Sequence, residues 1–218
     1  MARLASLALS LGLVFGCSLG GKDIGGHDDE ASESESAGEA ISTSDSTSDS
    51  TTDDCGPDTS GTYLLGLETS LGPDNPLQFV LTLDVMYGGD CLGVASFGLQ
   101  PLSLDMGSQT SPREFVGEPL IFAAIPFDAA GQFTLDMGEV MVTGAANPIT
   151  GSDIAATLVL EGHVVDVDAL CGDVFGMLTS PLQADLAGSS FAAIRLADDG
   201  SDPATLPTSF PYDCDQLP

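Results

Sequence analysis

Strict alternation of apolar and polar side chains constrains the fold of this chain more than any other feature. In QFVLTLDV (78–85) the apolar Phe, Leu, Leu and Val recur at every second position, and Thr82 and Asp84 fall on the opposite face. The segments GQFTLDMGEVMV (131–142) and IAATLVLEG (154–162) follow the same period. A β-strand points successive side chains to opposite faces, so these segments are predicted to be half-buried strands. No segment carries a sustained helical stripe, and we therefore predict an all-β domain.

An internal repeat covers most of this domain. Two segments align without a gap and share Cys, Val, Pro, Leu and Asp, and the same tetrapeptide, FAAI, follows each of them. The segments are CLGVASFGLQPLSLD (91–105) and CGDVFGMLTSPLQAD (171–185), with FAAI at 122–125 and 191–194. Matches that recur in the same order predict a duplicated four-strand unit, with copies at about 60–128 and about 130–198.

The duplication implies eight main strands. They are expected at 62–69, 78–86, 92–100, 119–127, 132–143, 154–165, 173–180 and 190–196. The intervening segments are rich in Gly, Pro, Asn and Asp, and their short turns favour antiparallel neighbours in an up-and-down order. Eight such strands form either a closed antiparallel barrel or a two-sheet sandwich, because both arrangements remove or protect the sheet edges.

The beginning of the chain has the layout of an export signal. MAR supplies one positive charge, LASLALSLGLVF is an unbroken apolar or small stretch, and Gly16 and Cys17 follow. The stretch is too short to span a bilayer. It resembles the signal peptide of bacterial lipoproteins, because Val14 and Gly16 match the lipobox before the cysteine, although Phe15 stands where a small residue is usual.

This resemblance implies an address and a membrane anchor. Residues 1–16 would be removed and Cys17 would carry the lipid, which makes the membrane a partner of the mature protein. Ser18 is the kind of residue that permits onward sorting to the outer membrane. The expected location is therefore the bacterial cell envelope, lipid-anchored in the outer membrane and periplasmic or surface-exposed. Ordinary signal cleavage, which would release a soluble secreted protein, is the alternative.

Residues 17–54 differ sharply from the rest of the chain in composition. From residue 20 to residue 54 only Ile24 and Ile41 are large and apolar, and eleven residues are Asp or Glu. Such a segment cannot bury enough surface to offset its ordering entropy, and its like charges repel one another. We predict a disordered, extended acidic tether before a single domain at 55–218.

Four cysteines remain once Cys17 is assigned to the lipid: Cys55, Cys91, Cys171 and Cys214. An even number of cysteines in an exported chain predicts two disulfides. In an up-and-down barrel all four lie at one end, and the proximity of the strands favours Cys55 with Cys91 and Cys171 with Cys214. The two other pairings stay open.

Cys171 also invites a catalytic interpretation, because His163 precedes it and Asp173 follows it. A cysteine nucleophile needs a neighbouring base and a lowered pKa, and closeness in sequence within strands supplies neither. Its partner in the repeat, Cys91, has no histidine at the matching position. We therefore predict that Cys171 is a disulfide cysteine.

Charge excludes several classes of partner. Eleven of the 33 acidic residues precede Cys55, and the 22 that follow face only two basic residues, Arg113 and Arg195. Nucleic-acid binding and basic lipid-binding patches need clusters of Lys and Arg, so neither is expected. Neutral, cationic or cation-bridged partners are favoured.

No motif for catalysis, cofactors or metals is present. The chain lacks a Gly-x-Ser-x-Gly elbow, His-Glu-x-x-His, a phosphate loop and a calcium loop, so no catalytic, cofactor or metal residue is predicted. The sequence favours a non-catalytic envelope lipoprotein with a binding or structural role, and a small ligand, a glycan or a protein could be its partner. The alternative is an envelope hydrolase whose site combines scattered carboxylates with His163.

Overall fold

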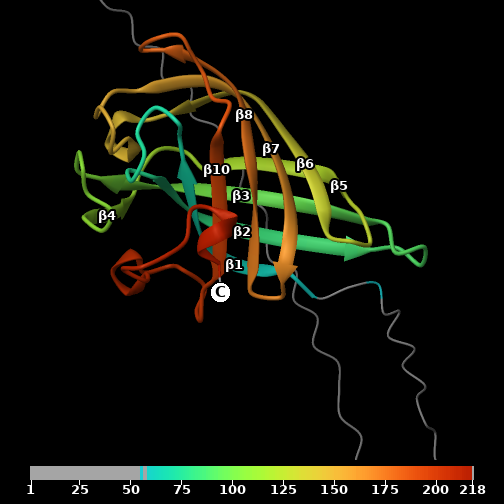
Figure 1. The fold of residues 1–218 in the computed structure, drawn as a ribbon. Helices are drawn as coiled ribbons and strands as arrows, with labels where there is room; N and C mark the ends of the chain where they lie inside the picture. Colours follow the sequence, from blue (N-terminus) through green and yellow to red (C-terminus); the bar gives the residue numbers. More distant parts are fainter. Residues whose placement is uncertain (1–54, 56–57, 218) are drawn as a thin grey trace, which may run out of the picture. The chain divides into compact units, whose positions relative to one another are not determined.

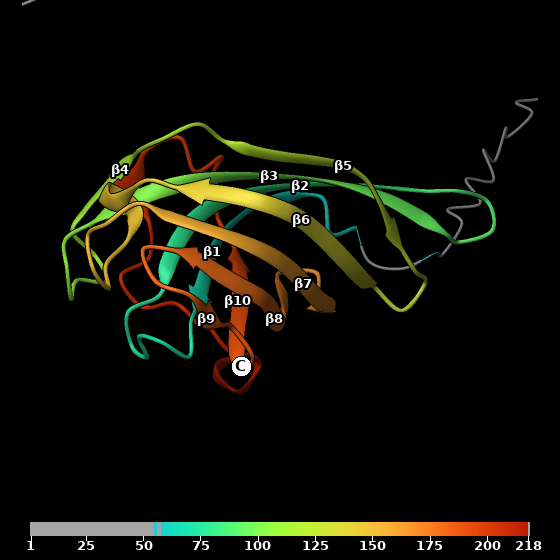
Figure 2. The same cartoon turned by 90° about the horizontal axis from the view of Figure 1, so that it is seen from above.

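The computed structural model describes Cys55 and residues 58–217 of the chain. Eight antiparallel strands close into a barrel, and two shorter strands extend it (Figure 1). The barrel strands are β1 (Gly61–Glu68), β2 (Leu77–Tyr87), β3 (Gly93–Leu104), β5 (Leu120–Phe127), β6 (Gln132–Val142), β7 (Ile154–Asp166), β8 (Ala169–Ser180) and β10 (Ser189–Arg195). Neighbours follow chain order, and β10 closes the circle by pairing with both β8 and β1 (Figure 2). The all-β prediction is confirmed, and the architecture is the barrel.

Two short strands lie outside the predicted pattern. β4 (Pro112–Phe115) pairs with β3, and β9 (Ala184–Asp185) pairs with β8. Each follows the third barrel strand of its half of the chain, so both halves contain the same order of elements, while the duplication itself stays a prediction. The short 3-10 helices are η1 (Gly144–Ala146), η2 (Pro203–Thr205) and η3 (Cys214–Gln216). None of the described residues forms a helix long and apolar enough to cross a membrane.

Strand β8 begins earlier than the sequence predicted. It starts at Ala169 rather than near residue 173, and Cys171 therefore lies inside the strand instead of opening it. The reason is a tight turn after β7, in which the carboxylate of Asp166 accepts a hydrogen bond of 2.8 Å from the backbone N–H of Asp168. This turn returns the chain at once into pairing with β7.

The barrel has a proximal end, where the chain enters from Cys55, and a distal end. The proximal end carries the turns at 88–92, 128–131 and 167–168. The distal end carries the longer connections at 69–76, 105–119, 143–153 and 181–188. The period-two alternation of the strands places one set of apolar side chains inside, and these form the main core of the protein.

A second, smaller apolar cluster lies on the outside of the barrel. Leu64 and Val80 point outward from β1 and β2 and are buried against Leu206 and Phe210 of the segment that follows β10. This C-terminal segment therefore shields part of the outer wall from water, and the burial of apolar surface holds it there.

Arg113 fastens this C-terminal segment to the barrel. Its guanidinium donates hydrogen bonds to the carbonyl oxygens of Leu206 (3.3 Å) and Pro207 (2.7 Å), and to Oε1 of Gln78 (2.9 Å). It also lies over the ring of Phe210, 5.2 Å from the ring centroid. Arg113 is 5% exposed, so its charge is directed at backbone oxygens and not at solvent.

Arg195 joins neighbouring segments of the chain at the proximal end. It donates to the carbonyl oxygens of Ser60 (2.8 Å) and Val167 (2.6 Å), and its Nε lies 2.9 Å from a carboxylate oxygen of Asp168. Its guanidinium is stacked 4.9 Å above the centroid of the Tyr63 ring. Both basic residues that follow Cys55 are therefore engaged by the fold itself.

Candidate binding cavity

Aromatic rings fill the proximal half of the barrel. The rings of Phe127 and Phe133 stack with their centroids 5.4 Å apart. The centroid of the Phe133 ring also lies 5.0 Å from that of Phe97 and 6.3 Å from that of Phe191. Tyr87 meets Phe127 edge-on at 6.4 Å, and burial raises the pKa of its phenol. Such rings bury large apolar areas and pack in preferred geometries, so they form the core of this half.

A glycine makes room for these rings. A β carbon at Gly162 would lie 2.5 Å from Cζ of Phe133 and 2.7 Å from Cζ of Phe191, closer than real side chains approach. The neighbouring β8 position is Gly172, where an added β carbon would collide with the backbone oxygen of Glu161. The aromatic packing therefore depends on Gly162, and the close pairing of β7 with β8 beside it depends on Gly172.

The distal half of the interior is not filled. A cavity of about 230 Å³ lies there, bounded by side chains from β1, β2, β6, β7 and β8 and by the distal loops. Its walls are aliphatic or small, as at Leu67, Val140, Ala156 and Leu178, with Phe79 as the single aromatic side chain. All lining residues belong to the described part of the chain, and none of them is charged.

The mouth of the cavity is apolar and reaches the surface. Leu71 and Leu182 line the cavity and are 44% and 51% exposed. The connections at 69–76 and 143–153 are in close contact with each other, because a β carbon at Gly72 would lie 2.7 Å from the side chain of Ile149. Exposed leucines at the opening of an apolar cavity are typical of a binding site, whereas a sealed packing defect does not have them.

Three polar side chains line the cavity. Asn147 is buried and holds its own loop, donating to Oγ1 of Thr150 (2.8 Å) and to the carbonyl of Ser152 (2.7 Å) and accepting from the N–H of Ile149 (3.1 Å). Thr69 differs, because its hydroxyl oxygen is buried without a hydrogen-bond partner among the described residues. The side chain of Asn147 therefore makes its hydrogen bonds within its own loop, whereas the hydroxyl of Thr69 makes none with the described residues.

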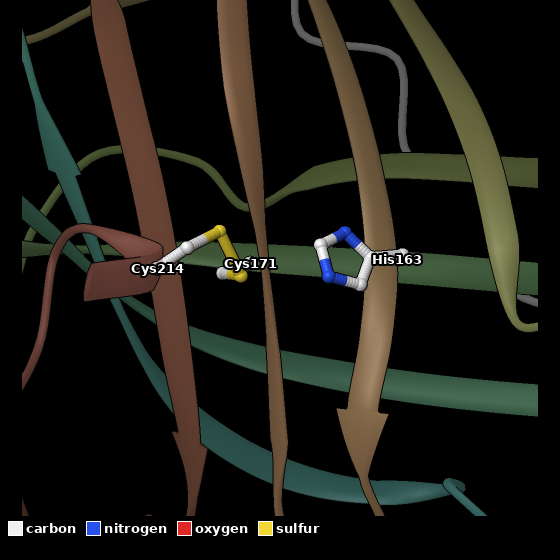
Figure 3. A group of neighbouring side chains, drawn as sticks. All are labelled: His163, Cys171 and Cys214. Carbon is white, nitrogen blue, oxygen red and sulfur yellow. A yellow bond between two sulfur atoms is a disulfide. The ribbon is translucent and has the colours of Figure 1, made fainter. Parts of the chain in front are cut away.

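The structure decides the role of Cys171. Cys171 on β8 forms a disulfide with Cys214, and His163 lies beside it on β7 (Figure 3). The ligand atoms of these three residues lie within 4.8 Å of one another, as in a metal site. Because both sulfurs are joined in the disulfide, neither is a thiolate, and Cys171 acts as neither nucleophile nor metal ligand in this state.

The second disulfide joins Cys55 to Cys91 and ties the start of the domain to the turn between β2 and β3. Both disulfides therefore have the pairing that the sequence favoured. Cys17, the predicted lipid attachment site, lies outside the described residues, as does the rest of the predicted tether.

The residues of the hydrolase alternative come together on the outer wall. Glu161 and Asp173 pair directly across β7 and β8, and with His163 and Asp128 they line an open depression of about 1000 Å³. Among the described residues, no hydrogen bond orients His163, and this depression is lined by no cysteine or serine nucleophile. Three carboxylates and one histidine of the hydrolase alternative therefore share one open depression.

The sequence analysis did not find the cavity. Its walls come from five strands that meet at one level of the barrel, and their common level depends on strand register. The only local signal is compositional, because phenylalanines cluster near the proximal turns at 88–92 and 128–131 while aliphatic residues follow the distal ones. No family model, curated protein or solved structure matches this chain.

Proposed function

We propose that the protein is a lipid-anchored barrel of the bacterial cell envelope that binds a small, mostly apolar molecule in the distal cavity. The observation that carries this proposal is a space of about 230 Å³ with uncharged, largely aliphatic walls in the distal half of the barrel. Binding sites for small molecules are concave and mostly apolar, with few polar groups. An apolar cavity of about 150 Å³ already holds benzene, so a somewhat larger ligand suits this one.

In this proposal the chain joins the barrel at the end opposite to the cavity. A lipid on Cys17, followed by the acidic segment 17–54, would attach the barrel through Cys55 at its proximal end. The exposed Leu71 and Leu182 mark the mouth at the distal end.

A catalytic function has weaker support. His163, Glu161 and Asp173 are neighbours on the outer wall and line a depression that is open to solvent, and the two cysteines nearby are joined in a disulfide. His163→Ala is expected to leave ligand binding unchanged. Hydrolase activity in a broad substrate screen that disappears in His163→Ala would favour the enzyme instead.

Binding of a small fluorescent probe tests the proposal. The full chain with Cys17→Ser, which removes the lipid, is titrated with 1-aminonaphthalene, an uncharged fluorophore whose emission changes in apolar surroundings. The chain contains no tryptophan, so the background is low. We expect saturable binding at one site, which Ala156→Leu abolishes because the larger side chain fills the cavity.

The matched control is Ala123→Leu, which adds the same atoms at an exposed position of β5. It should bind the probe like the parent chain. Circular dichroism of both variants establishes that the barrel is folded. The absence of saturable binding by the parent chain, or equal binding by the Ala156→Leu variant, would show that the distal cavity is not the site.

The anchor is tested separately in a bacterial host with lipoprotein processing. Wild-type chain is expected to enter the detergent phase on partition, and Cys17→Ser is expected to remain in the aqueous phase, because the lipid supplies the membrane affinity. Equal membrane association of the two chains would contradict lipidation at Cys17.

A further inference from the structure

His163, Cys171 and Cys214 meet on the outer wall of the barrel, where the C-terminal segment is bonded to β8 (Figure 3). One ligand atom from each residue lies within 4.8 Å of the other two. Among the described residues, no other group of three His, Cys, Asp or Glu side chains gathers as closely. The two sulfurs are bonded to each other in the disulfide, so the group becomes a set of metal ligands only after reduction.

The sheet holds two of the three ligands in place without the disulfide. Cys171 lies inside β8 and pairs with His163 on β7 and with Ala192 on β10. The alternation of side chains along β7 and β8 directs His163 and Cys171 to the outer face, because the neighbouring Leu170 belongs to the main core. Reduction of the disulfide therefore leaves the imidazole and the sulfur of Cys171 side by side.

The C-terminal segment holds the third ligand by contacts of its own. The carbonyl oxygen of Tyr212 accepts a hydrogen bond of 3.1 Å from Oγ of Ser190 on β10. Phe210 is buried on the outer wall and lies beneath the guanidinium of Arg113. Cys214 follows two residues after Tyr212. These contacts keep Cys214 close to Cys171 after the covalent bond between them is broken.

The disulfide is open to reduction from one side, because Cys214 is exposed whereas Cys171 is buried. The co-reactant is a dithiol, such as the reduced Cys-x-x-Cys pair of an oxidoreductase. Its first thiolate bonds to the sulfur of Cys214, and Cys171 leaves as a thiolate. Its second thiolate displaces Cys214 and closes a disulfide within the reductant. The dithiol thus gives up two electrons and two protons, and both cysteines become thiols.

We propose that the reduced protein binds one Zn²⁺ through the sulfurs of Cys171 and Cys214 and a ring nitrogen of His163. Thiolates and imidazoles are the ligands that suit zinc, and the two thiol protons pass to solvent when the metal binds. Ligand atoms of a tetrahedral zinc site lie about 3.5–3.8 Å apart, a separation that the two sulfurs can adopt once their bond is broken. Three protein ligands leave the fourth position to water.

The charges around the three ligands favour a cation. Glu161 and Asp173 lie two residues from His163 and Cys171 and face the same open depression as His163. Asp213 and Asp215 flank Cys214 on either side. Negative groups at this distance raise the local concentration of cations. None of the three ligands lines the distal cavity, so this inference goes beyond the proposed function and does not depend on it.

Cobalt binding to the reduced chain tests the proposal. The Cys17→Ser chain, which has no lipid and one thiol fewer, is reduced with dithiothreitol and then desalted under nitrogen. Co²⁺ is the probe, because it accepts the ligands of Zn²⁺ and its thiolate complexes absorb in the near ultraviolet. Competition by Zn²⁺ then gives the zinc affinity, and circular dichroism shows whether each reduced chain is folded.

We expect the reduced parent to bind one Co²⁺ per chain with thiolate charge-transfer absorption, and the oxidised parent to show none. His163→Ala should weaken zinc binding by at least about tenfold, because the loss of a direct ligand costs no less than the loss of its supporting contacts. The matched control is His27→Ala, which removes the only other histidine and should leave binding unchanged. Zn²⁺ should raise the melting temperature of the reduced parent more than that of His163→Ala.

A second control removes the other pair of thiols. The double variant Cys55→Ala/Cys91→Ala should keep the site, because those cysteines form a separate disulfide. Equal binding by the reduced parent and His163→Ala, or loss of binding in this double variant, would overturn the proposal. So would a reduced parent that unfolds, since Cys214 would then not be held by the C-terminal contacts. Failure of this test leaves probe binding in the distal cavity unaffected.

Discussion

The proximal and distal halves of the barrel differ in how their interiors are packed. In the proximal half, four phenylalanines contact one another and glycines leave space for their rings. In the distal half, leucines, valines and an alanine surround about 230 Å³ of space. The rings come from β3, β5, β6 and β10 and the cavity walls from β1, β2, β6, β7 and β8, so the two halves differ in the side chains that these strands supply.

This contrast implies that the proximal half contributes mainly to stability and the distal half mainly to ligand binding. Close-packed aromatic rings gain dispersion and hydrophobic energy, and the disulfides and Arg195 reinforce the same end. A cavity forfeits part of that energy, and proteins tolerate the loss where a ligand restores the contacts. We therefore expect changes in the proximal half to affect the free energy of unfolding most, and changes in the distal half to affect ligand binding most.

The largest expected effect is the removal of the central ring. Phe133→Ala deletes a side chain that contacts three other phenylalanines, and should lower the free energy of unfolding by about 3–5 kcal/mol. Leu178→Ala should cost about 2 kcal/mol, because one side of Leu178 already faces the cavity. Urea denaturation measures both, and equal costs would mean that the two halves are packed alike.

The next effect concerns the disulfide of the C-terminal segment. The bond between Cys171 and Cys214 spans a sequence separation of 43. Replacing both by alanine should lower the free energy of unfolding by about 2–4 kcal/mol, chiefly by freeing the unfolded chain. Probe binding at the distal cavity should persist below the lowered melting temperature. Loss of binding in a variant that is still folded would show that the two ends are not independent.

The smallest effects come from adding atoms to each half. Gly162→Ala should destabilise by about 1–3 kcal/mol, because its β carbon meets the rings of Phe133 and Phe191. Gly89→Ala, a glycine with open space around it, is the control and should be nearly neutral. Ala156→Leu should instead stabilise by about 0.5–2 kcal/mol by filling the cavity. Thermal unfolding distinguishes the signs, and destabilisation by Ala156→Leu would mean that the distal half has no spare volume.

The fold was largely predictable because its signals are local. The alternation in segments such as 78–85 and 132–142 marks strands directly, since side-chain direction in a strand depends only on neighbouring residues. The even number of cysteines and the up-and-down order favoured the observed disulfide pairing but left two other pairings open. The four-residue β4 and the two-residue β9 were missed because strands this short have too little alternation to be recognised.

The choice of barrel and the position of the cavity depend on long-range geometry. Closure requires β10 to pair with β1 and β8 at once, and no local pattern in 189–195 specifies two partners. The unpartnered, buried hydroxyl of Thr69 depends on contacts between residues that are far apart in the sequence. A threonine in a turn after a strand is otherwise an ordinary feature of a sequence.

The central claim is that the distal half, and not the proximal half, receives a ligand. Methyl-resolved NMR during a titration of the Cys17→Ser chain with 1-aminonaphthalene tests it most directly. We predict saturable shifts for the methyl groups of Leu67, Val140 and Leu178, which line the cavity, and none for the buried Leu83, Leu135 and Leu170 of the main core. Unchanged cavity methyl groups, or equal shifts in both sets, would contradict the account.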